Sequence, residues 1–207
     1  MEQNQLLSAR TASLASLISK PDNDLIDALN SGRLYRLLAA SPGLSEHDTE
    51  LFRDRTYRLE DLTELYMATM EASGHLSLQP IESVYKQWTD DAESYPLLYG
   101  KKGLLMGDPA LHMLELYRRF GIEIPEDFSG QPDHLILELE FLSFLYENGN
   151  DTMVCQFIKD HLDWVPDLIA KCDALNPAPF YCSALRMLDG FIKHERSRLE
   201  SLCEVKV

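Results

Sequence analysis

Two neighbouring side chains, Asp133 and His134, are the best candidates for chemistry in this sequence, because they stand directly before a long apolar run. A carboxylate beside an imidazole that titrates near neutral pH can serve as a catalytic dyad, a metal-ligand pair or a recognition site. Adjacent residues on a helix point about 100° apart, so the two side chains cannot readily chelate one ion together. A helix-start aspartate next to a hydrogen-bonded histidine is an equally good interpretation, and the pair alone does not decide between function and structure.

The other residues with chemical potential are weaker candidates. His161 lies on an apolar helical stripe shortly before Trp164, which is typical of a core histidine near a helix end. Residues 100–103, Gly-Lys-Lys-Gly, lack the spacing of a phosphate-binding loop, and no strand precedes them. The sequence therefore predicts a protein that is not an enzyme and holds no cofactor and no metal. A hydrolase or metal enzyme would require Asp133, His134 and His161 to converge.

The elements that would position these residues are helices. Apolar side chains recur at the helical period along nearly all of the chain, and no convincing strand pattern is present. The sequence therefore predicts an all-α fold of about ten helices. Asp108-Pro109 predicts the start of one helix and Gly121 its end. The least regular stretch is 73–107, and a connection of this length in a compact chain is usually functional or mobile.

Residues 132–148 predict the central and most buried helix. Pro132 suits the first helical position, where no backbone N–H is needed, and the run that follows is almost wholly apolar. In this arrangement Asp133 and His134 occupy the first turn of the helix, where their side chains are expected to reach solvent. The polar start of an apolar helix could then face a surface groove.

Composition and charge narrow the class of protein. The chain of 207 residues has 45% hydrophobic and 26% charged residues, the balance of a soluble globular protein. The net charge of −15 argues against a nucleic-acid partner or an anionic membrane. It is compatible with a cationic partner, although a solubilising acidic surface is the plainer explanation. No secretory signal and no membrane-spanning segment is expected, so stable membrane insertion is not predicted.

The four cysteines are expected to be reduced thiols. Cys155, Cys172, Cys182 and Cys203 show no C-x-x-C spacing, and all fall within helical patterns. This arrangement favours a cytosolic protein and argues against a disulfide framework or a zinc site.

Several short blocks, taken in order, resemble the TorD/DmsD/NarJ family, the cytoplasmic chaperones of molybdenum enzymes exported by the twin-arginine pathway. Residues 80–85, Pro-Ile-Glu-Ser-Val-Tyr, resemble the family's P-x-E-S-V-Y block, and Gly107-Asp108-Pro109 resembles its glycine-containing turn. Residues 131–135, Gln-Pro-Asp-His-Leu, resemble the E-x-P-D-H-L motif. Residues 161–164, His-Leu-Asp-Trp, with Pro-Phe-Tyr at 179–181, resemble the C-terminal pair of motifs. Each block alone is weak, but their succession is rather specific.

The resemblance implies a TorD-like all-α fold with two helical subdomains. The expected parts are an N-terminal subdomain (1–79), an irregular connecting or hinge segment (80–107) and a C-terminal subdomain (108–207). It also implies a cytoplasmic chaperone that binds the twin-arginine signal peptide and the apo form of a molybdenum-cofactor oxidoreductase. Such a protein would assist cofactor insertion, delay export, and exist as a monomer or a domain-swapped dimer. An acidic helical adaptor for a basic partner, with no maturation role, is the alternative.

By the same resemblance, particular residues are assigned to the leader-peptide site. The positions expected to line it are Tyr85, Gly107, Asp133 and His134. The supporting positions are Glu82, Ser83, Pro132, His161 and Trp164. A groove floored by the apolar central helix could bury the apolar part of a leader, while Asp133 could pair with its guanidinium groups.

Overall fold

The structure is a computed structural model of the chain, and it describes residues 2–53, 55–71, 76–175 and 179–203. Within these ranges the secondary structure consists of eleven α-helices and one short 3-10 helix, with no strand beyond an isolated bridge between Ile81 and His134. The predicted all-α fold is confirmed. No helix in this part of the chain is both long and apolar enough to cross a bilayer.

The molecule divides into two compact units, which we name the helical unit (Met1–Leu78 with Leu139–Val207) and the loop unit (Gln79–Glu138). The predicted division into 1–79, 80–107 and 108–207 follows the order of the chain, whereas the two units are defined by which residues contact one another. The predicted division therefore stays a prediction. The helical unit contains α1 (Glu2–Ile18), α2 (Asn23–Asn30), α3 (Arg33–Ala39), α4 (Glu46–Glu50), α5 (Leu59–Thr69), α9 (Asp151–His161), α10 (Val165–Leu175) and α11 (Pro179–Cys203). The loop unit contains α6 (Glu82–Tyr85), α7 (Asp108–Phe120) and the 3-10 helix η1 (Glu126–Phe128), while α8 (Leu135–Asn148) starts in the loop unit and ends in the helical unit.

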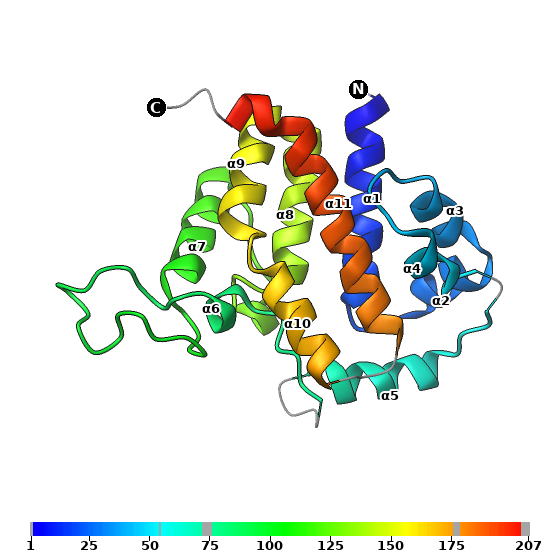
Figure 1. The fold of residues 1–207 in the computed structure, drawn as a ribbon, viewed down its shortest axis with the longest axis horizontal. Helices are drawn as coiled ribbons and strands as arrows, with labels where there is room; N and C mark the ends of the chain where they lie inside the picture. Colours follow the sequence, from blue (N-terminus) through cyan, green and yellow to red (C-terminus); the bar gives the residue numbers. More distant parts are fainter. Residues whose placement is uncertain (1, 54, 72–75, 176–178, 204–207) are drawn as a thin grey trace. The chain divides into compact units, whose positions relative to one another are not determined.

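Helix α11 is the centre of the helical unit. It packs against α1, α4, α9 and α10, and Figure 1 shows it running beside α1 and α9. Its inward side chains Tyr181, Leu185 and Leu188 are almost fully buried. Complete burial of one such leucine contributes about 1.5–3 kcal/mol to stability. The periodic leucines of this helix therefore hold the unit together.

Two glycines let α11 touch the turn that precedes α4. A Cβ on Gly43 or on Gly190 would lie too close to the backbone carbonyl oxygen of the other glycine. Gly43 also has a φ of 83°, a conformation that L side chains rarely adopt. Because neither glycine has a Cβ, the backbone of α11 can lie directly against the backbone of the turn.

Helix α7 begins and ends at the predicted residues, but α8 does not. Pro109 lies in the first turn of α7, and Gly121 ends the helix with a φ of 65°. Helix α8 begins at Leu135 instead of at 132, because the preceding backbone pairs with residues 80–82. The Asp133 carbonyl accepts a hydrogen bond from the Glu82 N–H at 3.0 Å, and the Leu135 N–H donates to the Pro80 carbonyl at 2.9 Å.

The expectation of reduced cysteines is wrong. Cys172 on α10 and Cys182 on α11 form a disulfide, and Cys155 is also disulfide-bonded. The two helices pack against each other, so residues ten apart in sequence have Cα atoms only 6.1 Å apart, which suits a disulfide. A spacing rule based on C-x-x-C cannot detect a pair that faces across two helices. The side chain of Cys203 lies outside the described residues.

Candidate functional site

Asp133 lies inside the loop unit, where it accepts hydrogen bonds from α6. Its side chain is fully buried. Asp133 Oδ2 accepts a hydrogen bond from the Ser83 backbone N–H at 2.7 Å and a second, short one from the Ser83 hydroxyl. Helix α6 has no side-chain cap from its own N-cap residue, Ile81. Asp133 therefore supplies the cap that this four-residue helix lacks.

Two further buried carboxyl groups, Glu82 and Glu138, lie in the same unit. Both are fully buried, and Lys86 Nζ lies 2.8 Å from Glu82 Oε1. Burial raises the pKa of Glu138 well above its usual value, and the neighbouring Glu82 raises it further. Burial also raises the pKa of Asp133, although the hydrogen bonds from Ser83 partly oppose this effect. The side chains of Glu82 and Glu138 are hydrogen-bonded to each other, so the two acidic groups form one buried pair.

His134 is buried and neutral. The residue is only 7% exposed, and its ring packs edge-on against Phe128, with ring centroids 5.1 Å apart. His134 Nδ1 accepts a hydrogen bond from the Ile136 backbone N–H at 3.2 Å. Burial lowers the pKa of His134 to about 4. At neutral pH the ring is therefore an acceptor and a packing surface, and it carries no positive charge.

The expectation that Asp133 and His134 reach solvent from the first turn of a helix is wrong. Both residues precede α8, and the pairing of their backbone with residues 80–82 turns them into the unit. Pro132 and Tyr85 are buried as well, and Tyr117 Oη donates to the Pro132 carbonyl at 3.1 Å. The structure thus brings Glu82, Ser83 and Asp133 together beneath the surface.

Gly107, which the sequence analysis assigned to the leader-peptide site, lies directly before α7 and packs against the backbone of Trp88. A Cβ at Gly107 would lie 2.6 Å from the carbonyl oxygen of Trp88. The same oxygen accepts a hydrogen bond from the Asp108 N–H at 2.7 Å. Glycine is required here because two backbone segments touch, and not because of an unusual φ.

His161 and Trp164 belong to the helical unit and form a local pair. Both are 2% exposed, and Trp164 Nε1 donates to the His161 carbonyl at 2.8 Å. The His161 ring stacks on Phe157 with centroids 5.1 Å apart. The arrangement matches the core histidine that the apolar stripe predicts. The role of these two residues in supporting leader binding stays a prediction, as does that of the residues in the loop unit.

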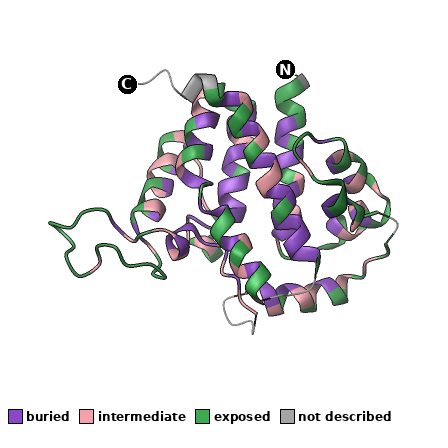
Figure 2. Cartoon of the chain, in the orientation of Figure 1, coloured by how far each residue is buried: buried purple, intermediate pink, exposed green. Residues whose placement is uncertain are grey.

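An exposed apolar surface lies on residues 88–106, which we name the 88–106 loop. The side chain of Leu97 is 86% exposed, an unusual state for a leucine. Figure 2 shows nearly the whole loop as exposed, between α6 and α7. Large apolar side chains of the loop that face solvent are Tyr95, Leu97, Tyr99, Leu104 and Leu105.

The base of this loop is anchored by hydrogen bonds. Trp88 Nε1 donates to the Leu105 carbonyl at 2.9 Å, and the Trp88 N–H donates to the Lys101 carbonyl at 2.7 Å. The Gly103 N–H donates to the Val84 carbonyl of α6 at 3.0 Å. The loop therefore extends from the segment that Asp133 and Gly107 hold in place.

The sequence predicts that the 88–106 loop is irregular, but it does not predict that the loop is an exposed apolar surface. Its exposed side chains follow no helical or strand period, so no pattern of burial could be assigned to them. The available signal was the density of leucine and tyrosine in a stretch containing Gly100 and Gly103. Once such a cluster is known to be exposed, it indicates an interaction surface.

Comparisons with known proteins are consistent with one family. A family model described as the nitrate reductase delta subunit matches residues 36–170. The chain is 27% identical to a chaperone protein TorD of Vibrio cholerae over 174 residues, which are 78% of each chain. It is 28% identical to a chaperone protein TorD of Vibrio atlanticus over 194 residues, 87% of this chain and 88% of the relative. A chaperone protein TorD of Vibrio parahaemolyticus is 30% identical over 118 residues, 51% of this chain and 55% of the relative.

Proposed function

The chain belongs to the family of the nitrate reductase delta subunit and the TorD chaperones, and from this premise we propose that it binds the twin-arginine leader of a molybdenum-cofactor oxidoreductase. It acts as a chaperone and not as an enzyme. Binding takes place in the cytoplasm before export, and the apo form of the same oxidoreductase is a further ligand during cofactor insertion. The observation that carries the proposal is the exposed apolar surface of the 88–106 loop.

The order of side chains along the loop is complementary to a twin-arginine leader, in which arginines precede an apolar segment. Asp90 and Glu93 are exposed carboxylates, and the exposed tyrosines and leucines follow them in sequence. Burying the apolar segment against these side chains would contribute about 25 cal/mol per Å². The carboxylates would pair with the guanidinium groups, while Lys101 and Lys102 disfavour placing the arginines at the other end of the loop.

In this proposal the buried residues position the loop. Asp133 caps α6, α6 holds Gly103 through Val84, and Gly107 closes the base against Trp88. Tyr85 and His134 are buried in the same unit. The leader then contacts the exposed loop. Asp133 and Gly107 do not contact the leader but hold the loop in the conformation that binds it.

The experiment is a calorimetric titration of a synthetic twin-arginine leader into the wild type and into two leucine variants. Leu97→Ser removes the most exposed leucine of the loop, and Leu111→Ser removes a 52% exposed leucine of α7 outside it. Burial of one leucine contributes about 1.5 kcal/mol or more, so Leu97→Ser is expected to weaken binding about tenfold. Leu111→Ser should leave the affinity unchanged. Equal affinities for all three proteins would contradict the proposal.

A second peptide separates the proposed function from that of an acidic adaptor. It keeps both arginines and replaces the apolar segment with serine and glycine. An adaptor that recognises only positive charge would bind the leader and the second peptide equally. The chaperone proposed here should lose most of its affinity for the second peptide, because the loop contributes mainly apolar contacts.

A further inference from the structure

The disulfide between Cys172 and Cys182 joins the last turn of α10 to the first turn of α11, within the helical unit. Cys172 is fully buried, whereas Cys182 is 8% exposed. The proposed leader binding gives this bond no role. A disulfide is nevertheless a reactive group, because thiols can break it and disulfides can re-form it.

The disulfide is the main contact between the end of α10 and the interior of the unit. Cys172 is the only buried residue among residues 169–175, all of which the structure describes. A second contact with α11 is the ion pair between Asp173 Oδ1 and Arg186 Nη2 at 2.5 Å, but both of its side chains are largely exposed, and exposed ion pairs contribute little. The stability of the end of α10 therefore depends on whether the disulfide is intact.

The neighbour of Cys172 connects α10 to another part of the same unit. Lys171 Nζ donates a hydrogen bond to the Leu78 carbonyl at 3.1 Å. Leu78 is fully buried, and its N–H donates to the Thr69 carbonyl of α5 at 2.8 Å. Leu78 is also the residue at which the chain leaves the helical unit for the first time. Loosening the end of α10 would therefore also loosen the chain at this exit.

The location assigned under the proposed function determines how such a bond behaves. In the cytoplasm, glutathione and thioredoxin keep thiols reduced, and the disulfides that do form there are usually transient, catalytic or redox-sensing. This step alone rests on the proposed function. A disulfide on which one helix end depends is then expected to change with the thiol redox state of the surroundings.

We propose that Cys172 and Cys182 form a reversible redox switch: glutathione reduces the bond and frees the end of α10, and oxidised glutathione forms the bond again. The oxidised protein holds α10 against α11. In the reduced protein the end of α10 is held only by packing and by the exposed ion pair, so it opens more often. The switch thus couples the local stability of the helical unit to the thiol redox state.

Reduction proceeds by two successive thiol–disulfide exchanges. When the end of α10 opens, the thiolate of one glutathione attacks Cys182 Sγ, the sulfur of the more exposed residue, and the bond to Cys172 Sγ breaks. Cys172 leaves as a thiolate and takes up a proton. A second glutathione attacks the mixed disulfide, releasing the Cys182 thiol and oxidised glutathione. Two glutathione molecules thus supply the two electrons that the protein disulfide takes up.

The first test measures whether the bond responds to glutathione. The protein is equilibrated in mixtures of reduced and oxidised glutathione that span the cytosolic range, free thiols are blocked with iodoacetamide, and mass spectrometry measures the label on Cys172 and Cys182. The label is expected to rise about tenfold or more from the most oxidising to the most reducing mixture. A pair that stays joined in every mixture, or stays reduced in every mixture, would overturn the proposal.

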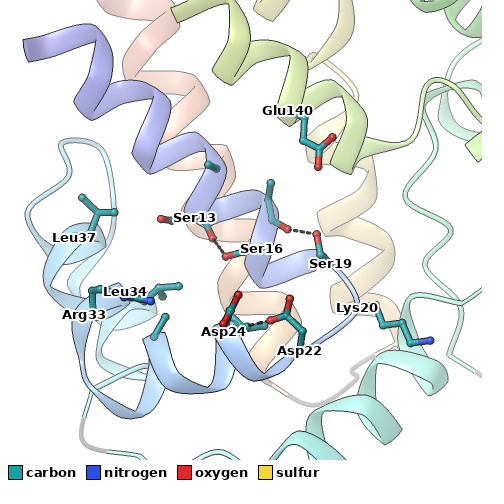
Figure 3. A pocket seen from close by; sticks show the side chains of 14 residues that line it. Ser13, Ser16, Ser19, Lys20, Asp22, Asp24, Arg33, Leu34, Leu37 and Glu140 are labelled. Atoms are coloured by element: carbon teal, nitrogen blue, oxygen red, sulfur yellow. Dashed lines mark hydrogen bonds between the residues drawn. The ribbon is translucent and has the colours of Figure 1, made fainter. Parts of the chain in front are cut away.

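Hydrogen exchange then measures what reduction does to α10. The amides of residues 172–175 are expected to exchange roughly tenfold faster or more in the reduced protein, because a disulfide commonly contributes at least that much stability. Helix α2 is the internal reference, and Figure 3 shows how Asp22 caps it by accepting a hydrogen bond from the Leu25 N–H at 2.8 Å. The described residues that line the groove between α1, α2 and α3 include none from α10, so the amides of α2 should be unaffected.

Two serine variants assign the response to this bond. Cys182→Ser should exchange rapidly at residues 172–175 in every glutathione mixture. Cys155→Ser is the matched control, because Cys155 belongs to α9 and is not part of the Cys172–Cys182 bond, and it should keep the full response. The reduced wild type needs no substitution, so the comparison holds even if a variant fails to fold. Equal exchange in oxidised and reduced wild type, equal acceleration in α2, or an unchanged response in Cys182→Ser would refute the switch. Neither test uses a leader peptide, so its failure is distinct from a failure of leader binding.

Discussion

The loop unit inverts the usual distribution of side chains between its interior and its surface. Inside it, Glu82, Asp133 and Glu138 are fully buried, and outside it, the leucines and tyrosines of the 88–106 loop face solvent. Burying a carboxyl group is costly unless it is hydrogen-bonded, and exposing a leucine forgoes hydrophobic stabilisation. The comparison suggests a division of roles: the acidic groups determine local structure, and the apolar loop is available for binding.

The largest effect on stability is expected when the buried acceptor Asp133 is removed. Asp133→Ala leaves the Ser83 N–H and hydroxyl without their partner, so we expect the free energy of unfolding to fall by about 3 kcal/mol. Asp133→Asn keeps an oxygen acceptor and should cost only about 1 kcal/mol. Urea unfolding of the three proteins measures both values. If Asp133→Ala were as stable as the wild type while leader binding disappeared, the division of roles would be reversed.

A somewhat smaller effect is expected where the buried region meets the loop. In Gly107→Ala the new Cβ lies against the Trp88 carbonyl, and relieving that overlap should cost about 2 kcal/mol. Gly130→Ala is the matched control, because a Cβ there meets nothing within 4 Å. Urea unfolding and leader titration should show that Gly107→Ala loses both stability and affinity. A loss of stability with full affinity would mean that the base of the loop does not determine its shape.

The interior should also respond to pH through His134. Its pKa is about 4 in the folded protein and 6.5 in a model peptide, so the unfolded chain binds the proton more tightly and stability falls as the pH drops below 6.5. The fall due to this residue is about 1.4 kcal/mol per pH unit until the pH reaches about 4. The raised pKa of Glu138 has the opposite sign, because the folded state then holds the proton more tightly.

The contribution of His134 is isolated by comparing the wild type with His134→Gln, which does not titrate. The difference in unfolding free energy between the two proteins should change in favour of the variant as the pH is lowered from 6.5 to 5. The carboxyl contribution is common to both proteins and largely cancels. A difference that stays constant with pH would show that the imidazole can be protonated in the folded state without cost.

The smallest expected effect is that of the loop on stability. Leu97→Ser should shift the free energy of unfolding by no more than about 0.5 kcal/mol, because the side chain makes little contact in the free protein. Urea unfolding checks this value, with Leu111→Ser as the comparison. A clearly larger loss would mean that the loop is packed against the protein and is not an open binding surface.

The sequence predicted the helices better than it predicted the surroundings of the motif residues. Helix α7 is specified locally by Pro109 and Gly121, so both of its ends are confirmed. The start of α8 was wrong by three residues, because the pairing of residues 133–135 with 80–82 is a tertiary contact that no periodicity reveals. The burial of Asp133 and His134 follows from that same pairing and was missed for the same reason.

Two other features, a disulfide and an exposed leucine, could not be predicted from the sequence of the segments that contain them. The disulfide between Cys172 and Cys182 requires knowledge of how α10 and α11 face each other. The exposure of Leu97 could not be deduced from composition, because a leucine in an aperiodic stretch is as compatible with a core as with a surface. The motif blocks identified the correct region of the chain, whereas only the folded arrangement separates its supporting residues from its exposed ones.

The cap that Asp133 gives to α6 has a consequence for the time course of folding. A helix of four residues cannot persist alone, because nucleation is unfavourable and few hydrogen bonds compensate for it. Its cap lies 50 residues further along the chain, so α6 can form only after that long loop has closed. The base of the 88–106 loop depends on α6 and is therefore completed late. During synthesis the ribosome must have released the segment beyond Asp133 before the loop acquires its final shape, so a nascent or truncated chain would lack this surface.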